Sequence, residues 1–263
     1  MDELRVSVAT YDQVLFSHPE HGMTMLALER KATVLKDGSV KVRAQPFGGG
    51  VKILDPSSLG EMLGELRFDS ERSKQDQDLR ILIPPSKWDE VRQYCLRHLE
   101  DLADNDLESS PVRELTEEFE ETLSVDLKPE QYTFQPIGSV VEDHPVWTEN
   151  WYARGFPTVR VYRTYSVQLL DVKLCRTLLA ASQEISDEML GKRAMENETG
   201  RANSVLVLPL NSVTEAWLAL PPELRYRKIK VEGYELDESV LAVLGDVEVP
   251  QYQRINKRQS PSR

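Results

Sequence analysis

The segment from Ser110 to Leu123, SPVRELTEEFEETL, constrains the fold more than any other part of the chain. Its start predicts a helix, because Ser110 can cap free backbone N–H groups and Pro111 suits the first helical position. At about 100° per residue, the segment has an apolar face and an acidic face. These faces comprise Val112, Leu115, Phe119 and Leu123 on one side, and Glu114, Glu117, Glu118 and Glu121 on the other. The apolar face predicts packing against a core.

The acidic face of this segment has two interpretations. Carboxylates three and four residues apart are neighbours on a helix, and each such pair repels by about 0.3 kcal/mol. The face is either simply solvated, as on many surface helices, or it surrounds a hard divalent cation, which prefers oxygen ligands. The pattern of charges by itself leaves both interpretations open.

A glycine-rich turn precedes the helix in the sequence. A predicted hairpin with Asp37-Gly38 at its turn leads into QPFGGGV, residues 45–51. Three consecutive glycines, Gly48, Gly49 and Gly50, permit positive φ and a close approach of the backbone to a ligand. The alternative is a flexible turn without a binding role.

Both stretches resemble one family. RELTEE, from Arg113 to Glu118, resembles the core of the Nudix box, R-E-U-x-E-E, and PFGGGVK resembles the P-G-G element that precedes it, with Phe47 as an extra residue. The resemblance implies that Glu114, Glu117 and Glu118 hold Mg²⁺ or Mn²⁺. It also implies that a backbone carbonyl of the turn at Gly48, Gly49 and Gly50 joins them around the metal.

The function implied by the resemblance is metal-dependent hydrolysis of a nucleoside diphosphate linked to another small molecule. The metal would neutralise the diphosphate and acidify a water molecule. In the catalytic set we place Glu117, Glu118 and Arg113, with the general base left open between these carboxylates and Glu142.

Residues outside these two motifs are candidates for holding the nucleotide. Trp151 and Arg154 lie on an irregular loop, residues 144–157, which suits either base stacking with an arginine on a phosphate or a loop pinned by its tryptophans. Three strand arginines, Arg43, Arg160 and Arg163, are candidates for the phosphate. We expect Arg160 and Trp151 to belong to the ligand site.

The chain departs from the family pattern at three places. A long segment, residues 56–105, separates the glycines from the helix; Asn105 stands where the family has a glycine, and Glu120 replaces the glycine after the glutamate pair. These departures suggest an alternative, a catalytically inactive Nudix-like module that binds a nucleotide or a protein. A third possibility is an unrelated structural protein whose acidic helix is solvated.

The expected fold class is α/β, a Nudix-like mixed sheet sandwiched between helices with an inserted α/β segment. Periodicity predicts one Nudix-like domain over residues 1–220, with residues 56–105 as the insertion. Residues 221–250 form a C-terminal extension. The polar and basic residues 251–263 predict a disordered tail.

Composition limits the partners. A formal net charge of −12 over 263 residues argues against a groove for a nucleic-acid polymer but permits a small phosphorylated ligand bridged by a cation. The chain has no apolar run long enough to span a bilayer and no signal peptide, so we expect a cytoplasmic protein without a membrane partner. Cys95 and Cys175 have no metal-ligand spacing and suit small buried positions. The oligomeric state is left open.

Overall fold

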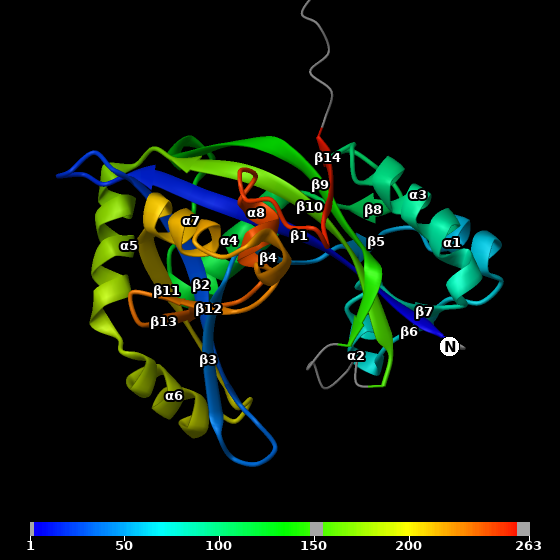
Figure 1. Cartoon of the computed structure of the whole chain (residues 1–263), viewed down its shortest axis with the longest axis horizontal. Helices are drawn as coiled ribbons and strands as arrows, with labels where there is room; N and C mark the ends of the chain where they lie inside the picture. Colours follow the sequence, from blue (N-terminus) through cyan, green and yellow to red (C-terminus); the bar gives the residue numbers. More distant parts are fainter. Residues whose placement is uncertain (1–2, 148–154, 257–263) are drawn as a thin grey trace, which may run out of the picture.

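The computed structural model describes residues 3–147 and 155–256, and within them a large mixed sheet organises the molecule (Figure 1). Its centre is the parallel pair β1 (Leu4–Ser17) and β10 (Pro157–Leu169), with the strand order β12-β13-β3-β2-β1-β10-β9-β14. The other strands in this order are β2 (Thr24–Val34), β3 (Val40–Gln45), β9 (Tyr132–Trp147), β12 (Ile229–Val231), β13 (Tyr234–Leu236) and β14 (Gln253–Asn256). Off this path, β11 (Arg201–Pro209) pairs with β2, β4 (Phe47–Gly50) and β7 (Arg80–Ile83) pair with β1, and β6 (Arg67–Phe68) pairs with β7.

Helices cover both faces of this sheet. Strand alternation sends Val8 and Val14 of β1 to one face and Ala9 and Tyr11 to the other. The first face carries α3 (Trp88–His98), α4 (Pro111–Leu123) and α5 (Val172–Glu184), and the second carries α7 (Leu210–Leu218) and α8 (Val240–Val243). A further helix, α6 (Asp187–Glu196), packs near β2 and β3. The predicted α/β sandwich is therefore confirmed.

Helix α4 has the predicted boundaries. Its N-cap Ser110 accepts a hydrogen bond from the N–H of Val112 at 3.3 Å, and Pro111 occupies the first turn. Leu115 and Phe119 are buried, and the Phe119 ring lies 5.1 Å from the ring of Phe47 at the start of β4. The apolar face of the helix therefore packs against the same strand that carries the glycines.

The predicted insertion, residues 56–105, contributes strands to the sheet. It contains α1 (Ser57–Leu63), α2 (Glu71–Gln75), β6, β7 and α3, and β7 pairs antiparallel with the first half of β1. Its buried residues, including Leu59 and Val91, share a core with Val6 and Val8 of β1. The insertion lies at one end of the molecule, with α1 and α3 on the right of Figure 1.

The C-terminal segment packs across the face of the sheet opposite α4. Strand β13 pairs with β3 through Leu236 and Ala44, and the guanidinium of Arg254 donates to four carbonyl oxygens at the end of α8 and just after it. Residues 253–256, which lie in the segment predicted as a tail, form β14 against β9, since pairing with an open strand edge stabilises even a polar segment. Within the described parts of the chain, no helix is long and apolar enough to cross a membrane.

Candidate metal centre

The glycine strand and the acidic helix meet. The backbone N–H of Gly48 donates a hydrogen bond of 2.8 Å to Oε2 of Glu118, whose residue is 8% exposed. Beside it, Gly49 lies so close to the carboxylate of Glu114 that a Cβ atom there would overlap Oε2. Two segments 70 positions apart in the sequence therefore form one acidic site.

Glycine is required along this strand because of a positive φ at Gly48 and because a Cβ atom would overlap neighbouring atoms. Gly48 has a φ of +131°, and a Cβ atom on it would overlap the carbonyl oxygen of Thr10 on the paired strand β1. A Cβ atom on Gly50 would lie 2.8 Å from Cγ of Asp78. At Gly49 and Gly50 the space left by the missing side chain is occupied by a carboxylate, so Asp78 lies beside the site although the sequence analysis did not single it out.

Arg113 holds three carboxylates in place. Its guanidinium pairs with Glu108 at 2.7 Å, with Glu117 at 3.0 Å and with Glu114. The side chain of Glu117 is 56% exposed, whereas Glu114 is half-buried against Gly49. Burial raises the pKa of Glu114, and Arg113 opposes that shift. Arg113 thus links the three carboxylates, and Glu117 is the most exposed of them.

Two residues of β2 complete the buried part of the site. The ammonium of Lys31 lies 2.5 Å from Oε2 of Glu29 and 3.6 Å from Oε1 of Glu118, and Gln45 donates to Glu29 at 3.3 Å. Burial and the adjacent Glu29 raise the pKa of Glu118. Desolvation lowers the pKa of Lys31, but the two carboxylates outweigh it, so the net direction is upward.

Asp12 brings a further carboxylate beneath α4. It is 0% exposed, and neither of its oxygens has a hydrogen-bond partner among the described residues. Burial, and then repulsion from Glu114, raises its pKa well above the usual range. The sequence held a signal that was missed, since an acid between Thr10 and Val14 on the apolar face of a strand requires a reason.

The predicted phosphate-binding arginines all have partners. Arg160 pairs with the buried Glu142 at 2.7 Å, Arg43 pairs with Asp237 at 2.5 Å, and Arg163 is buried. Arg160 and Arg163 lie on β10 and Arg43 lies on β3, and Arg163 stands opposite Thr10 of β1, the residue that pairs with Gly49 on its other side. Trp151 and Arg154 lie outside the described residues.

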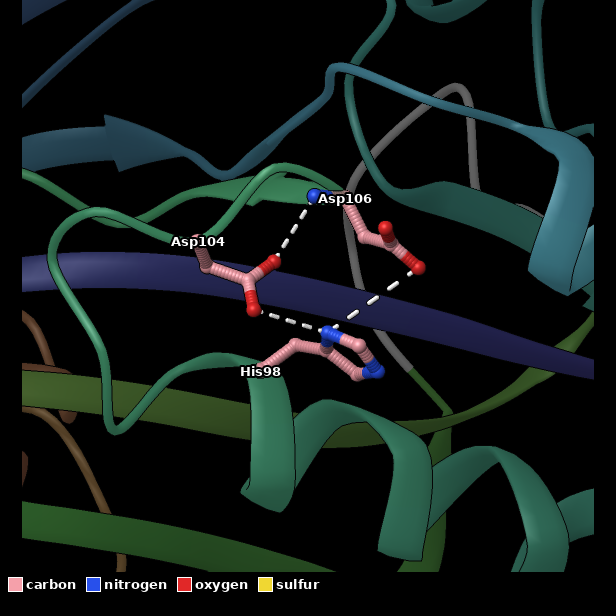
Figure 2. A group of neighbouring side chains, drawn as sticks. All are labelled: His98, Asp104 and Asp106. Atoms are coloured by element: carbon pink, nitrogen blue, oxygen red, sulfur yellow. Dashed lines mark hydrogen bonds and ion pairs between the residues drawn. The ribbon is translucent and has the colours of Figure 1, made fainter.

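A second polar cluster lies at the end of α3 (Figure 2). Nδ1 of His98 is 2.9 Å from Oδ2 of Asp104 and 3.9 Å from Oδ2 of Asp106. Among the described residues, only these three bring candidate ligand atoms from a trio of side chains within 4.8 Å of one another. The other oxygen of Asp104 accepts the N–H groups of Asp106 and Leu107, and Tyr94 donates to Asp106. These bonds close the turn before β8 (Leu107–Glu108), which accounts for the cluster as a structural feature.

Carboxylates gather beside the glycine strand, although among the described residues no three of them bring ligand oxygens within 4.8 Å of one another. Glu114, Glu118, Glu29 and Asp78 carry the oxygen atoms that Mg²⁺ and Mn²⁺ prefer. Oε1 of Glu29 is buried and accepts no hydrogen bond from any described residue, so at least one donor atom is available for a ligand. The carboxylates of Glu114 and Asp78 occupy the space beside Gly49 and Gly50, where a larger residue would overlap them.

Comparison with known families agrees with this geometry. The family model of the SMODS-associated NUDIX domain matches residues 32–205, more than half of the chain. The chain belongs to the SMODS-associated NUDIX domain family. The predicted Nudix membership is therefore confirmed, and the match includes both the glycine strand and α4, whereas Glu29 and Lys31 lie just before it. No curated protein and no solved structure matches the chain.

Proposed function

We propose that the protein is a metal-dependent hydrolase that acts on a nucleoside diphosphate linked to another small molecule. The observation that carries this proposal is the hydrogen bond from Gly48 to Glu118, together with the close approach of Gly49 to Glu114. Membership of the SMODS-associated NUDIX domain family supports the same assignment for the acidic helix.

In this proposal Glu114 and Glu118 hold Mg²⁺ or Mn²⁺, and Glu117 approaches the cation when it leaves Arg113. The cation supplies charge neutralisation for the diphosphate and a more acidic water. Such a cation would offset the repulsion between an anionic ligand and the carboxylates of the site.

The proposal assigns Glu114 and Glu118 to the cation, so neither of them is also assigned the role of general base. Arg113 fixes the orientation of Glu114, and Gly49 keeps the Glu114 carboxylate beside the strand. Glu142, a further candidate for the general base, is fully buried and paired with Arg160, so it is held away from solvent.

A second candidate function is binding of a nucleotide without hydrolysis. All three predicted metal ligands are already paired with cations of the protein, since Glu118 lies near Lys31 and both Glu114 and Glu117 pair with Arg113. This pairing supports a ligand-binding or protein-interaction module that has no catalytic activity.

Two measurements test the proposal and separate the candidates. Isothermal titration with Mn²⁺ should show binding in the wild type and loss of binding in Glu118→Gln. The matched control is Glu121→Gln, which removes an exposed carboxylate one turn further along α4 and should bind Mn²⁺ as the wild type does.

The second measurement is turnover of a panel of dinucleotides and ADP-ribose in the presence of Mn²⁺. Product release is followed by chromatography. A loss of rate on the order of 100-fold in Glu118→Gln supports the hydrolase. Equal, very slow turnover by the wild type and Glu118→Gln, with Mn²⁺-dependent nucleotide binding retained in the wild type, supports the binding module. Absence of Mn²⁺ binding in the wild type would contradict both.

A further inference from the structure

The ammonium of Lys31 lies among the carboxylates at the buried end of the metal centre. It is 2.5 Å from Glu29 and 3.6 Å from Glu118. Glu29 and Lys31 are two residues apart on β2, so both side chains project from the same face of the strand. Glu118 reaches this point from α4 and is fixed there by the N–H of Gly48. The ammonium therefore stands where carboxylates of a strand and a helix converge.

Glu29 is the most deeply buried member of this group. It is 0% exposed, and its Oε1 has no hydrogen-bond partner among the described residues, while Oε2 binds Lys31 and Gln45. A buried carboxylate with an unoccupied oxygen is costly unless a cation or a donor approaches it. Glu29 thus offers a ligand atom at the site.

The charges in this group do not balance. Glu29 and Glu118 carry two negative charges when ionised, and Lys31 supplies one positive charge. A divalent cation in the same position would neutralise both carboxylates and would satisfy more oxygen atoms than an ammonium, which offers hydrogen bonds only. The same two residues are therefore better matched to a divalent cation than to the lysine.

Lys31 is able to leave this position. Its side chain is 35% exposed, in contrast to both carboxylates, and its four-carbon stem is flexible. An ammonium that swings outward regains its hydration, whereas Glu29 and Glu118 stay fixed by β2, Gln45 and Gly48.

We propose that Lys31 is a built-in counterion that occupies the cation position at Glu29 and Glu118 in the metal-free protein, and that a divalent cation binds there by displacing its ammonium. Glu29 is then a metal ligand contributed from outside the acidic helix. The inference rests on the proposed function, because it concerns the same metal centre.

Isothermal titration with Mn²⁺ tests the displacement. Lys31→Met keeps the length of the side chain and removes the competing charge, so its Kd for Mn²⁺ should be about tenfold lower than that of the wild type. Lys31→Arg retains a competitor and should not bind more tightly. Lys192→Met, which removes an exposed lysine of α6, controls for the change in net charge.

Reductive methylation of the wild type with formaldehyde and borohydride, read by mass spectrometry, tests the same step if Lys31→Met fails to fold. Saturating Mg²⁺ should increase modification of Lys31 several-fold and leave that of Lys192 unchanged.

The outcomes separate the two proposals. Mn²⁺ binding by Lys31→Met that equals or is weaker than that of the wild type, or Lys31 reactivity unaffected by bound Mg²⁺, would overturn the role of Lys31 and leave the metal centre intact. Absence of Mn²⁺ binding by both the wild type and Lys31→Met would overturn the metal centre and the role of Lys31 together.

Discussion

Gly48 and Glu118 are joined by a hydrogen bond of 2.8 Å across 70 positions of sequence. The long insertion between them is compatible with this contact because its two ends are pinned together. Strands β5 (Lys52–Ile53) and β8 pair through Lys52 with Glu108 and Ile53 with Leu107. Since the entropy of closing a loop grows slowly with its length, one short strand pair at the base is enough to return the chain to the helix.

Gly48→Ala should destabilise the fold. The alanine would have to adopt a φ of +131°, and its Cβ would overlap the backbone of Thr10, which cannot move away without breaking the β1–β4 pair. We expect the free energy of unfolding to fall by about 2 kcal/mol or more, measured by urea denaturation. Gly60→Ala, in helix α1 with open space around its Cβ, is the control and should raise stability by about 0.5–1 kcal/mol. Equal effects of the two variants would contradict the role of Gly48.

Gly49→Ala should separate metal binding from stability. The new Cβ would displace the carboxylate of Glu114, which is the end of a flexible side chain, so the fold can adjust. We expect Mn²⁺ affinity to fall by about tenfold and the free energy of unfolding to change by less than about 1 kcal/mol. Calorimetric titration and urea denaturation of the same preparation measure the two effects. Unchanged Mn²⁺ affinity would argue that Glu114 is not a ligand.

The carboxylate of Asp104 should make the stability of the fold depend on pH. Although partial burial acts in the opposite direction, hydrogen bonds from the N–H groups of Leu107 and Asp106, together with His98, lower the pKa of Asp104. A carboxyl group with a depressed folded-state pKa stabilises the protein above its unfolded pKa of 3.8, and that contribution is lost as the pH falls through the folded-state value. Asp104→Ala should therefore lower the Tm at pH 7 and have a smaller effect near pH 3, in thermal scans at both pH values. An equal loss at both pH values would show that the charge is not involved.

Helix α4, at the candidate metal centre, was predictable because its information is local. Ser110, Pro111 and the apolar spacing of Leu115 and Phe119 specify its start and its buried face within one continuous segment. A close approach of the backbone at the glycines was predictable for a similar reason, because consecutive glycines permit it, but the sequence indicated a turn where the structure has strand β4.

The carboxylates contributed by strands were not predictable in this way. Glu29 and Asp78 become neighbours of α4 only through the pairing of distant strands, and no local period marks them. The predicted acidic face is also divided by tertiary contacts, because Glu118 is buried by β2 and β4 whereas Glu117 stays exposed beside Arg113. Burial by a neighbouring element, and not helical spacing, decides which acid belongs to the buried site.

Asp12→Asn should stabilise the metal-free protein. Asp12 is fully buried, both of its oxygens lack partners among the described residues, and its pKa is raised by burial and by Glu114. An acid whose folded-state pKa is raised contributes most to stability below the unfolded pKa of 3.8 and loses that contribution as the pH rises toward the folded-state value. Asparagine cannot ionise, so the variant avoids this loss.

The advantage of Asp12→Asn, measured by urea denaturation in the presence of a chelator, should therefore grow as the pH rises from 4 to 8 and reach about 1 kcal/mol or more. Asp126→Asn removes an exposed carboxylate that pairs only with Lys128 at the surface, and its effect should stay within about 0.5 kcal/mol at every pH. A stability gain that does not vary with pH would show that the packing of the asparagine side chain, and not the loss of the charge, stabilises the variant. A loss of stability at pH 8 would show that the carboxylate of Asp12 stabilises the metal-free protein, which would contradict the charge argument.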